Sequence, residues 1–264
     1  EVENYRTDVR IVNTSLFMTD WYIDQMKRQV YESKPLPISF EHSQYVQGTR
    51  DAILFDKKTE NRWDIKNLIQ FIASDDPRTI VDLPNGQKIH YYPTDKIRIP
   101  VNKEAVIKNR LVNLKDQDSI LPYIDVDIKT GALYKNRLMM FDVLANNNWE
   151  RPIYFTGGAF ADEDYLWMKD YLQLEGLAYK LVPIRTPVKD KDNPMDMGKI
   201  DADKMYNSVT KWYWGNGESD KIYHDPETRK NSITYRTNLS RLMFQLIDEG
   251  QLAKAEKVAD LAMK

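Results

Sequence analysis

The sequence contains no cysteine and only three histidines in 264 residues. The absence of cysteine excludes disulfide bonds, thiolate nucleophiles and cysteine-ligated metal centres. His42, His90 and His224 are far apart, so no pair has the i, i+4 spacing of a helical metal site. The sequence also has no Ser-His-Asp set, P-loop or G-x-G-x-x-G run. These absences predict a chain that binds no cofactor and has no recognisable catalytic motif of its own.

Long hydrophobic runs and a strong net charge are also missing. No apolar segment approaches the ~20 residues that span a bilayer, and no signal peptide is present. The formal net charge is −2, so no global field favours nucleic acid. Hydrophobic residues make up 42% and charged residues 30%, as in folded soluble proteins. Because the chain starts without methionine and stops inside a helical pattern, we expect a fragment of a longer protein.

Hydrophobic periodicity predicts one α/β domain over residues 1–185, with a mostly parallel sheet flanked by helices. A "PNG" turn predicts β-hairpin insertions around 79–101. The strand-helix-strand order over 120–157 predicts parallel strands with a right-handed crossover. In its second strand, the apolar run Ile153–Phe155 fits a strand buried on both faces. Strands are expected at 8–13, 51–56, 120–129, 151–157 and 177–184, and helices at 14–33, 62–74, 134–148 and 162–176.

The composition changes after residue 185. Residues 186–232 are rich in charge and proline and predict an irregular linker with an aromatic cluster. Residues 233–264 contain two helical patterns joined across Gly250. Gly250, Ala255 and Ala262 match the small-residue positions of a tetratricopeptide-like hairpin, so we expect the start of a helical repeat array.

Three stretches resemble a known family: "YRTDVRIVNTSLFMTDWYIDQMKRQ", "NNNWERPIYFTGG" and "YLQLEGLAYKLVPI". They are similar to the C-terminal soluble part of a large Bacteroidetes family of multi-spanning membrane proteins of unknown function. The membrane half of that family resembles lipid-sugar-dependent glycosyltransferases of the C-type fold and an animal protein O-mannosyltransferase. The resemblance implies that this chain lies on the periplasmic face of the inner membrane and that its partner is the missing N-terminal membrane half. It places catalysis in that half, so no catalytic residue is transferred to this chain.

One candidate site is the D-x-D triplet of Asp125 and Asp127 in "IDVDIK". Nucleotide-sugar transferases use such pairs to hold a divalent cation against a diphosphate, because hard cations prefer carboxylate oxygens. Both aspartates fall on one face of the predicted strand. The alternative is a half-buried strand with a solvated acidic face.

A second candidate is "TDWYIDQMKR", where Asp20 and Asp24 are one helical turn apart and Trp21 follows the first. Carboxylates beside an aromatic ring suit sugar binding, and a glycosidase-like pair is conceivable at this spacing. The alternative is an amphipathic helix that buries Trp21 and exposes its charges.

Two further candidates come from glycine-rich and aromatic segments. Thr156, Gly157 and Gly158 follow a predicted strand, at the edge where α/β sheets bind ligands. Trp212 and Trp214, in "KWYWGNGES", provide either an exposed stacking platform or a buried anchor for the linker.

The sequence therefore predicts a non-catalytic periplasmic domain of a membrane glycosyltransferase-like protein. Its expected role is to recognise an acceptor peptide or glycan, or to support assembly. Two alternatives stay open. One is an independent metal-dependent α/β enzyme, acting on a sugar or phosphate with Asp125 and Asp127 as ligands. The other is a purely structural scaffold.

Overall fold

The computed structural model describes residues 6–156, 164–188, 197–214, 217, 219 and 221–263. Contacts divide the chain into two compact units, Glu1–Arg151 and Pro152–Lys264. Among the described residues, no helix combines the length and apolar character needed to cross a membrane. The division falls inside the predicted 1–185 domain, but compact units need not coincide with domains, so the boundaries at 185 and 232 stay predictions.

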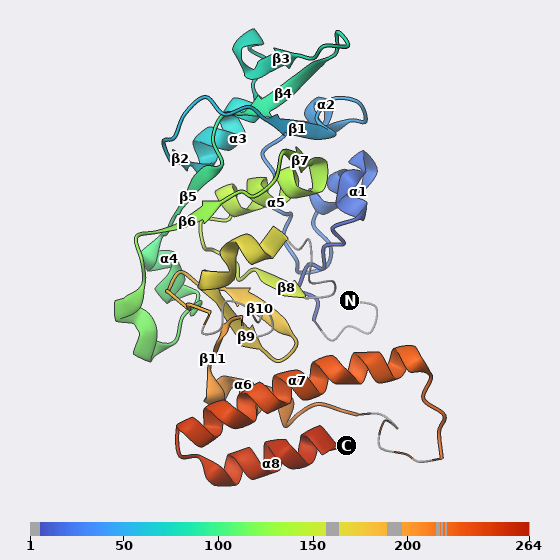
Figure 1. Ribbon diagram of the computed structural model, residues 1–264, viewed down its shortest axis with the longest axis vertical. Helices are drawn as coiled ribbons and strands as arrows, with labels where there is room; N and C mark the ends of the chain where they lie inside the picture. Colours follow the sequence, from blue (N-terminus) through green and yellow to red (C-terminus); the bar gives the residue numbers. More distant parts are fainter. Residues whose placement is uncertain are drawn as a thin grey trace. The chain divides into compact units, whose positions relative to one another are not determined.

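The first unit contains two small sheets (Figure 1). One has the order β3-β4-β1-β7 and the other the order β2-β5-β6. Their strands are β1 (Ala52–Phe55), β2 (Trp63–Asp64), β3 (Ile80–Asp82), β4 (Lys88–Tyr92), β5 (Lys96–Pro100), β6 (Tyr123–Asp127) and β7 (Ala132–Tyr134). The helices are η1 (Leu16–Met18), α1 (Asp20–Met26), α2 (His42–Tyr45), α3 (Ile65–Ala73), η2 (Pro77–Thr79), α4 (Lys103–Lys108), η3 (Leu114–Ser119) and α5 (Lys135–Asn146).

The core of this unit forms where α3 and α5 pack on each other and α3 packs on β4 and β5. Helix α3 is amphipathic because Ile65, Leu68, Ile69 and Ile72 recur at i, i+3, i+4 and i+7, and all four are buried. Asp64 caps its first turn by accepting a hydrogen bond from the Lys66 amide. The burial of one face of α3 thus follows directly from the sequence pattern.

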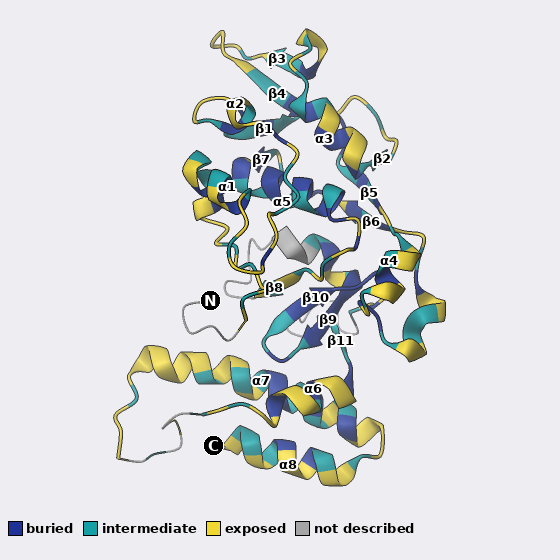
Figure 2. Ribbon diagram, turned by 180° about the vertical axis from the view of Figure 1, so that it is seen from behind, coloured by how far each residue is buried: buried dark blue, intermediate teal, exposed yellow. Residues whose placement is uncertain are grey.

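The second unit contains one sheet and a helical hairpin. The sheet order is β11-β9-β10-β8, and α7 and α8 lie side by side after it (Figure 1). Figure 2 shows α7 largely exposed over its N-terminal half. The elements are β8 (Tyr154–Thr156), η4 (Asp164–Tyr171), β9 (Leu172–Glu175), β10 (Ala178–Leu181), β11 (Lys199–Ile200), α6 (Ala202–Val209), α7 (Pro226–Asp248) and α8 (Leu252–Met263).

The predicted α/β class and the C-terminal helical hairpin are confirmed. Gly250 separates α7 from α8 with a φ of +73°, a left-handed conformation that glycine adopts without strain. The β-hairpin of β3 and β4 is also confirmed, with Gly86 of the "PNG" turn at a φ of +80°.

The prediction of a mostly parallel sheet is wrong. Five of the eight strand pairings among the described residues are antiparallel. The strand-helix-strand segment is the clearest failure, because β6 pairs antiparallel with β5 and β8 belongs to another sheet. Sequence order alone does not say which strand is the hydrogen-bonding neighbour of another.

Several predicted elements also differ from those observed. Residues 8–13 form no strand, and the helix predicted over 14–33 is limited to η1 and α1. The segment predicted as one helix over 162–176 is described from residue 164 on, where η4 is followed directly by β9. Strand β8 is not buried on both faces, since Tyr154 is 44% exposed at the edge of its sheet. Short apolar runs fit several structures, and packing chooses between them.

Asp142, in the middle of α5, is fully buried and joins this helix to the segment before α2. Its carboxylate accepts hydrogen bonds from the Ser39 amide at 2.7 Å, the Ser39 hydroxyl at 2.6 Å and the Asn146 side-chain amide at 2.7 Å. Burial raises the pKa of Asp142, although the bonds from Ser39 oppose this shift. The carboxylate therefore accepts from two residues of the same unit, Asn146 on its own helix and Ser39, which lies 103 positions from Asp142 in sequence.

Asp142→Ala is expected to lower the free energy of unfolding by about 1–3 kcal/mol, because the donors of Ser39 and Asn146 lose a buried acceptor. Urea denaturation measures this loss. The matched control is Asp118→Ala on η3, where the side chain is exposed and the change is expected to stay within about 0.5 kcal/mol. Equal effects of the two substitutions would contradict a structural role for Asp142.

Candidate functional site

Asp20, Trp21 and Asp24 all lie on α1. Asp24 accepts a hydrogen bond from the Tyr45 hydroxyl at 2.7 Å and lies 3.0 Å from His42 Nδ1, so it joins α1 to α2. Partial burial would raise the pKa of Asp24, but the hydrogen bonds from Tyr45 and His42 lower it overall. A glycosidase general acid needs a raised pKa, so Asp24 is unsuited to that role.

Trp21 is not buried by its helix, because 55% of the residue is exposed. This exposure disfavours the alternative of an amphipathic helix that buries Trp21. Its ring meets that of Tyr22 edge to face at 5.6 Å. The Asp20 carboxylate accepts the backbone N–H of Trp21 at 2.7 Å, in the first turn of α1. Sugar binding at Asp20 and Trp21 stays a prediction.

Asp125 and Asp127 on β6 are both engaged by arginines. Arg98 on β5 donates two hydrogen bonds to Asp125, at 2.8 and 2.9 Å, and stacks over the Tyr123 ring at 3.5 Å. Arg62 donates to Asp127 at 2.8 Å and approaches Asp125 at 3.4 Å. These carboxylates form a cross-strand ion-pair network, and such pairing leaves few oxygen lone pairs for a cation. The pairing argues against the metal hypothesis for this triplet.

Thr156 is exposed at the end of β8, opposite Ala178 of β10, whereas Gly157 and Gly158 lie outside the described residues. Trp212 and Trp214 pack edge to face at 5.9 Å, and both contact the Tyr235 ring of α7. Both indoles are half-buried. This packing favours the anchor over the stacking platform, since the two rings are held against α7.

The turn after α5 builds a different site, which the sequence interpretation missed. Asn148 and Trp149 have φ values of +46° and +60°, a left-handed conformation that is uncommon for residues other than glycine. Three hydrogen bonds from side chains to backbone carbonyls help to hold this turn: Trp149 Nε1 donates to the Pro100 carbonyl at 2.8 Å, Asn109 Nδ2 to the Trp149 carbonyl at 3.2 Å, and Asn147 Nδ2 to the Arg151 carbonyl at 2.8 Å. Consecutive strained residues held in this way are typical of functional sites.

Helix α4 forms the facing wall. Asn102 caps it by accepting the Ala105 amide at 3.1 Å, while its own amide donates to Asn148 at 3.3 Å. The buried Val106 fixes the inner face of α4, so the adjacent Glu104 and Lys108 remain exposed on the other side. Because strand β5 ends just before Asn102, the cap and the indole contact at Pro100 position α4 and the turn together.

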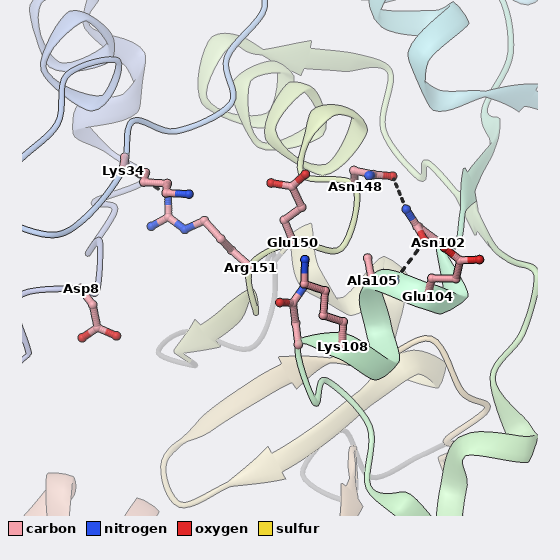
Figure 3. A pocket seen from close by; sticks show the side chains of 10 residues that line it. Asp8, Lys34, Asn102, Glu104, Ala105, Lys108, Asn148, Glu150 and Arg151 are labelled. Carbon is pink, nitrogen blue, oxygen red and sulfur yellow. Dashed lines mark hydrogen bonds between the residues drawn. The ribbon is translucent and has the colours of Figure 1, made fainter.

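A pocket of about 680 Å³ lies between these walls. Figure 3 shows Asp8, Lys34 and Arg151 on one side, Asn102, Glu104 and Asn148 on the other, and Glu150 between them. Three acidic and three basic side chains line it, so its formal charge is balanced. The lining consists of Asp8, Lys34, Asn102, Glu104, Ala105, Lys108, Asn109, Asn148, Glu150 and Arg151.

The charged side chains of this pocket differ in how many hydrogen bonds and ion pairs they already make within the protein. Arg151 donates to the carbonyls of Lys34 at 3.0 Å and Pro35 at 3.3 Å, and burial, followed by the charge of Arg10, lowers its pKa. The side chains of Lys34, Glu104, Lys108 and Glu150, by contrast, make no ion pair or hydrogen bond with the part of the chain that the structure describes. Within the described residues, the pocket thus presents two ammonium groups and two carboxylates that have no hydrogen-bond or ion-pair partner.

A second polar cluster, in the other unit, was also not predicted. Glu175 Oε1 lies 2.6 Å from Lys204 Nζ and 3.7 Å from Lys180 Nζ, and Oε2 accepts the Tyr154 hydroxyl at 2.8 Å. Lys180 is almost fully buried, and this burial lowers its pKa to about 8 even though Glu175 opposes the shift. The cluster joins β8, β9, β10 and α6 through one carboxylate, and we interpret it as structural.

Comparison with known proteins identifies the family. A family model described as "TMEM260-associated domain 2" matches residues 1–204, which is most of the chain. The chain therefore belongs to this family. No match is found among curated proteins or among solved structures.

Trp149→Phe is expected to lower the free energy of unfolding by about 1–3 kcal/mol, because the Pro100 carbonyl loses its buried indole donor. Chemical denaturation measures the change. Trp21→Phe makes the same substitution at an exposed position and is expected to change stability by less than about 0.5 kcal/mol. If both variants were as stable as the wild type, the indole contact would not hold the turn.

A second prediction concerns Lys180. Its pKa of about 8 in the folded chain lies below the ordinary value of 10.5. Between pH 8 and 10.5, the folded state therefore binds fewer protons than the unfolded state. Stability therefore rises with pH in this window, and we expect a gain of about 1–2 kcal/mol from pH 8 to about 9.5 relative to Lys180→Met. Urea denaturation across this range measures it. The exposed Lys230→Met should keep the wild-type slope, and an equal slope in Lys180→Met would refute the assignment.

Proposed function

We propose that this TMEM260-associated domain is a non-catalytic recognition domain, which binds the acceptor of a glycosyl transfer performed by the membrane half of its parent protein. Support comes from the family match over residues 1–204 and from the sequence resemblance to glycosyltransferase-like membrane proteins. The family description itself names an association with TMEM260 and no reaction. The glycosyltransferase activity of the parent protein is thus part of the proposal.

The observation that favours recognition is the pocket between α4 and the Asn148–Trp149 turn. Its volume falls in the ~300–1,000 Å³ range of small-molecule sites. It is built by the "NNNWER" stretch, one of the segments on which the family resemblance depends. Strained backbone, a preformed cavity and charged side chains without internal partners are together typical of a binding site, and the described lining residues include no paired nucleophile and base.

The alternative of a metal-dependent enzyme is disfavoured because the carboxylates of Asp125 and Asp127 accept hydrogen bonds from arginines. Within the described ranges, no group of three or more histidine or acidic side chains has the arrangement of a metal site. A purely structural scaffold remains the outcome if the pocket binds nothing.

Binding is tested by protein-observed NMR titration with two ligand classes, short oligosaccharides and unstructured serine- and threonine-rich peptides. We expect shift changes confined to residues around the pocket with at least one class. The variant Glu104→Gln/Glu150→Gln should weaken binding, whereas Glu227→Gln, an exposed glutamate on α7, should leave it unchanged. Absence of binding by both classes would refute the proposed function.

We also propose that the domain lies on the periplasmic face, next to the membrane half, and that α7 and α8 begin a tetratricopeptide-like array. The absence of cysteine from this chain allows a direct test of the location. In the full-length protein, with other accessible cysteines removed, Leu114→Cys places a thiol at an 86% exposed position. Labelling by a membrane-impermeant maleimide in cells with a permeabilised outer membrane is expected. Labelling only after lysis of the inner membrane would contradict a periplasmic location.

A further inference from the structure

We infer that the ligand of the pocket is a neutral oligosaccharide rather than a peptide, an inference that rests on the proposed recognition function. It depends on three properties of the lining: the elements from which it is built, its balance of charge, and the hydrogen-bonding capacity left over once internal contacts are made.

The elements that line the pocket do not match the common modes of peptide recognition. No described strand contributes to the lining, so an extended peptide has no sheet edge to join. Among the described residues that line it, Ala105 is the only apolar one, so an amphipathic helix finds no hydrophobic groove there. The described part of the lining also has no aromatic side chain, which leaves a polyproline segment without its usual platform. Backbone-directed binding of a peptide is therefore disfavoured.

The charge balance argues against a charged ligand. With three acidic and three basic side chains, the pocket offers no net field for a phosphate, an acidic peptide or a basic peptide. Recognition of phosphorylated motifs uses clusters of arginines. The described lining of this pocket contains one arginine, Arg151, and its guanidinium already donates to backbone carbonyls. A ligand without net charge meets no net electrostatic repulsion from either set of side chains.

Sugar hydroxyls fit the remaining hydrogen-bonding groups, because each hydroxyl both donates and accepts. The carboxylates of Glu104 and Glu150 accept from hydroxyl donors, and the ammonium groups of Lys34 and Lys108 donate to hydroxyl or ring oxygens. Hydrogen bonds to charged groups are worth about 1.5–3 kcal/mol, more than those between neutral partners. Acceptors and donors thus line the same cavity, whose volume of about 680 Å³ suits a short oligosaccharide.

The described lining residues include no aromatic ring, and this sets the expected binding free energy. Without a stacking surface, binding depends on hydrogen bonds made by exposed groups that compete with water, so we expect a dissociation constant of about 0.1–1 mM. The affinity should depend little on ionic strength because the ligand is uncharged, whereas binding of a charged peptide would weaken as salt screens it.

The experiment is an NMR titration of the whole chain with mannotriose, chitotriose, an unstructured Gly-Ser-Thr peptide and inorganic phosphate, at low and high salt. We expect one of the trisaccharides to shift residues around the pocket with a salt-independent affinity. Glu150→Gln should weaken its binding about tenfold, the equivalent of losing one charge-assisted hydrogen bond. Glu227→Gln should have no effect, and thermal unfolding of both variants checks that the fold is retained.

The outcomes separate this inference from the proposed function. If the peptide shifts the pocket residues and neither trisaccharide does, the ligand is a peptide; the inference is then overturned and the recognition function stands. If phosphate binds and displaces the sugars, the pocket is an anion site and the inference is again overturned. If none of the four probes binds, both the inference and the proposed function fail.

Discussion

The candidate site depends on one contact, the hydrogen bond from the Trp149 indole to the Pro100 carbonyl. Trp149 follows α5 and Pro100 ends β5, so this bond joins a helix end to a strand end 49 residues earlier. The indole is buried and its N–H would be costly to leave without an acceptor, which keeps Trp149 in its left-handed conformation. The same geometry places Glu150 and Arg151 at the pocket and brings Asn148 within reach of Asn102.

Charged side chains have two different uses in this chain. Asp125 and Asp127 are paired with Arg98 and Arg62 on neighbouring segments, and Glu175 holds Lys180 and Lys204. In these places, opposite charges attract one another and join neighbouring strands and helices. At the pocket, Glu104, Lys108 and Glu150 face solvent without such partners among the described residues. The most conspicuous acidic motif of the sequence is thus paired with arginines, whereas less conspicuous charges line the cavity.

Prediction of the fold from the sequence succeeded where a pattern is local. Helix α3 was predictable because its apolar residues repeat at helical spacing, and the β3–β4 hairpin because "PNG" specifies its turn. The helical hairpin followed from Gly250 between two amphipathic segments. The pairing of strands was not predictable in this way, and β6 and β8 were wrongly placed in one parallel sheet. Which strands become neighbours is decided by the packing of the whole unit, and no local signal encodes it.

The sequence by itself determined the chemistry available: no thiol, few imidazoles, balanced charge, and helical and hairpin segments whose local patterns are strong. It also contained the "NNNWER" stretch, which the sequence pattern assigned to the end of a helix over 134–148 and the start of the following strand. Only the tertiary structure decided that this turn has two residues with positive φ and that the indole reaches Pro100. The physical reason is that a strained turn persists only when its surroundings satisfy its polar groups, and two of the residues that do so here, Asn109 and Pro100, lie 40 and 49 positions away from Trp149 in sequence.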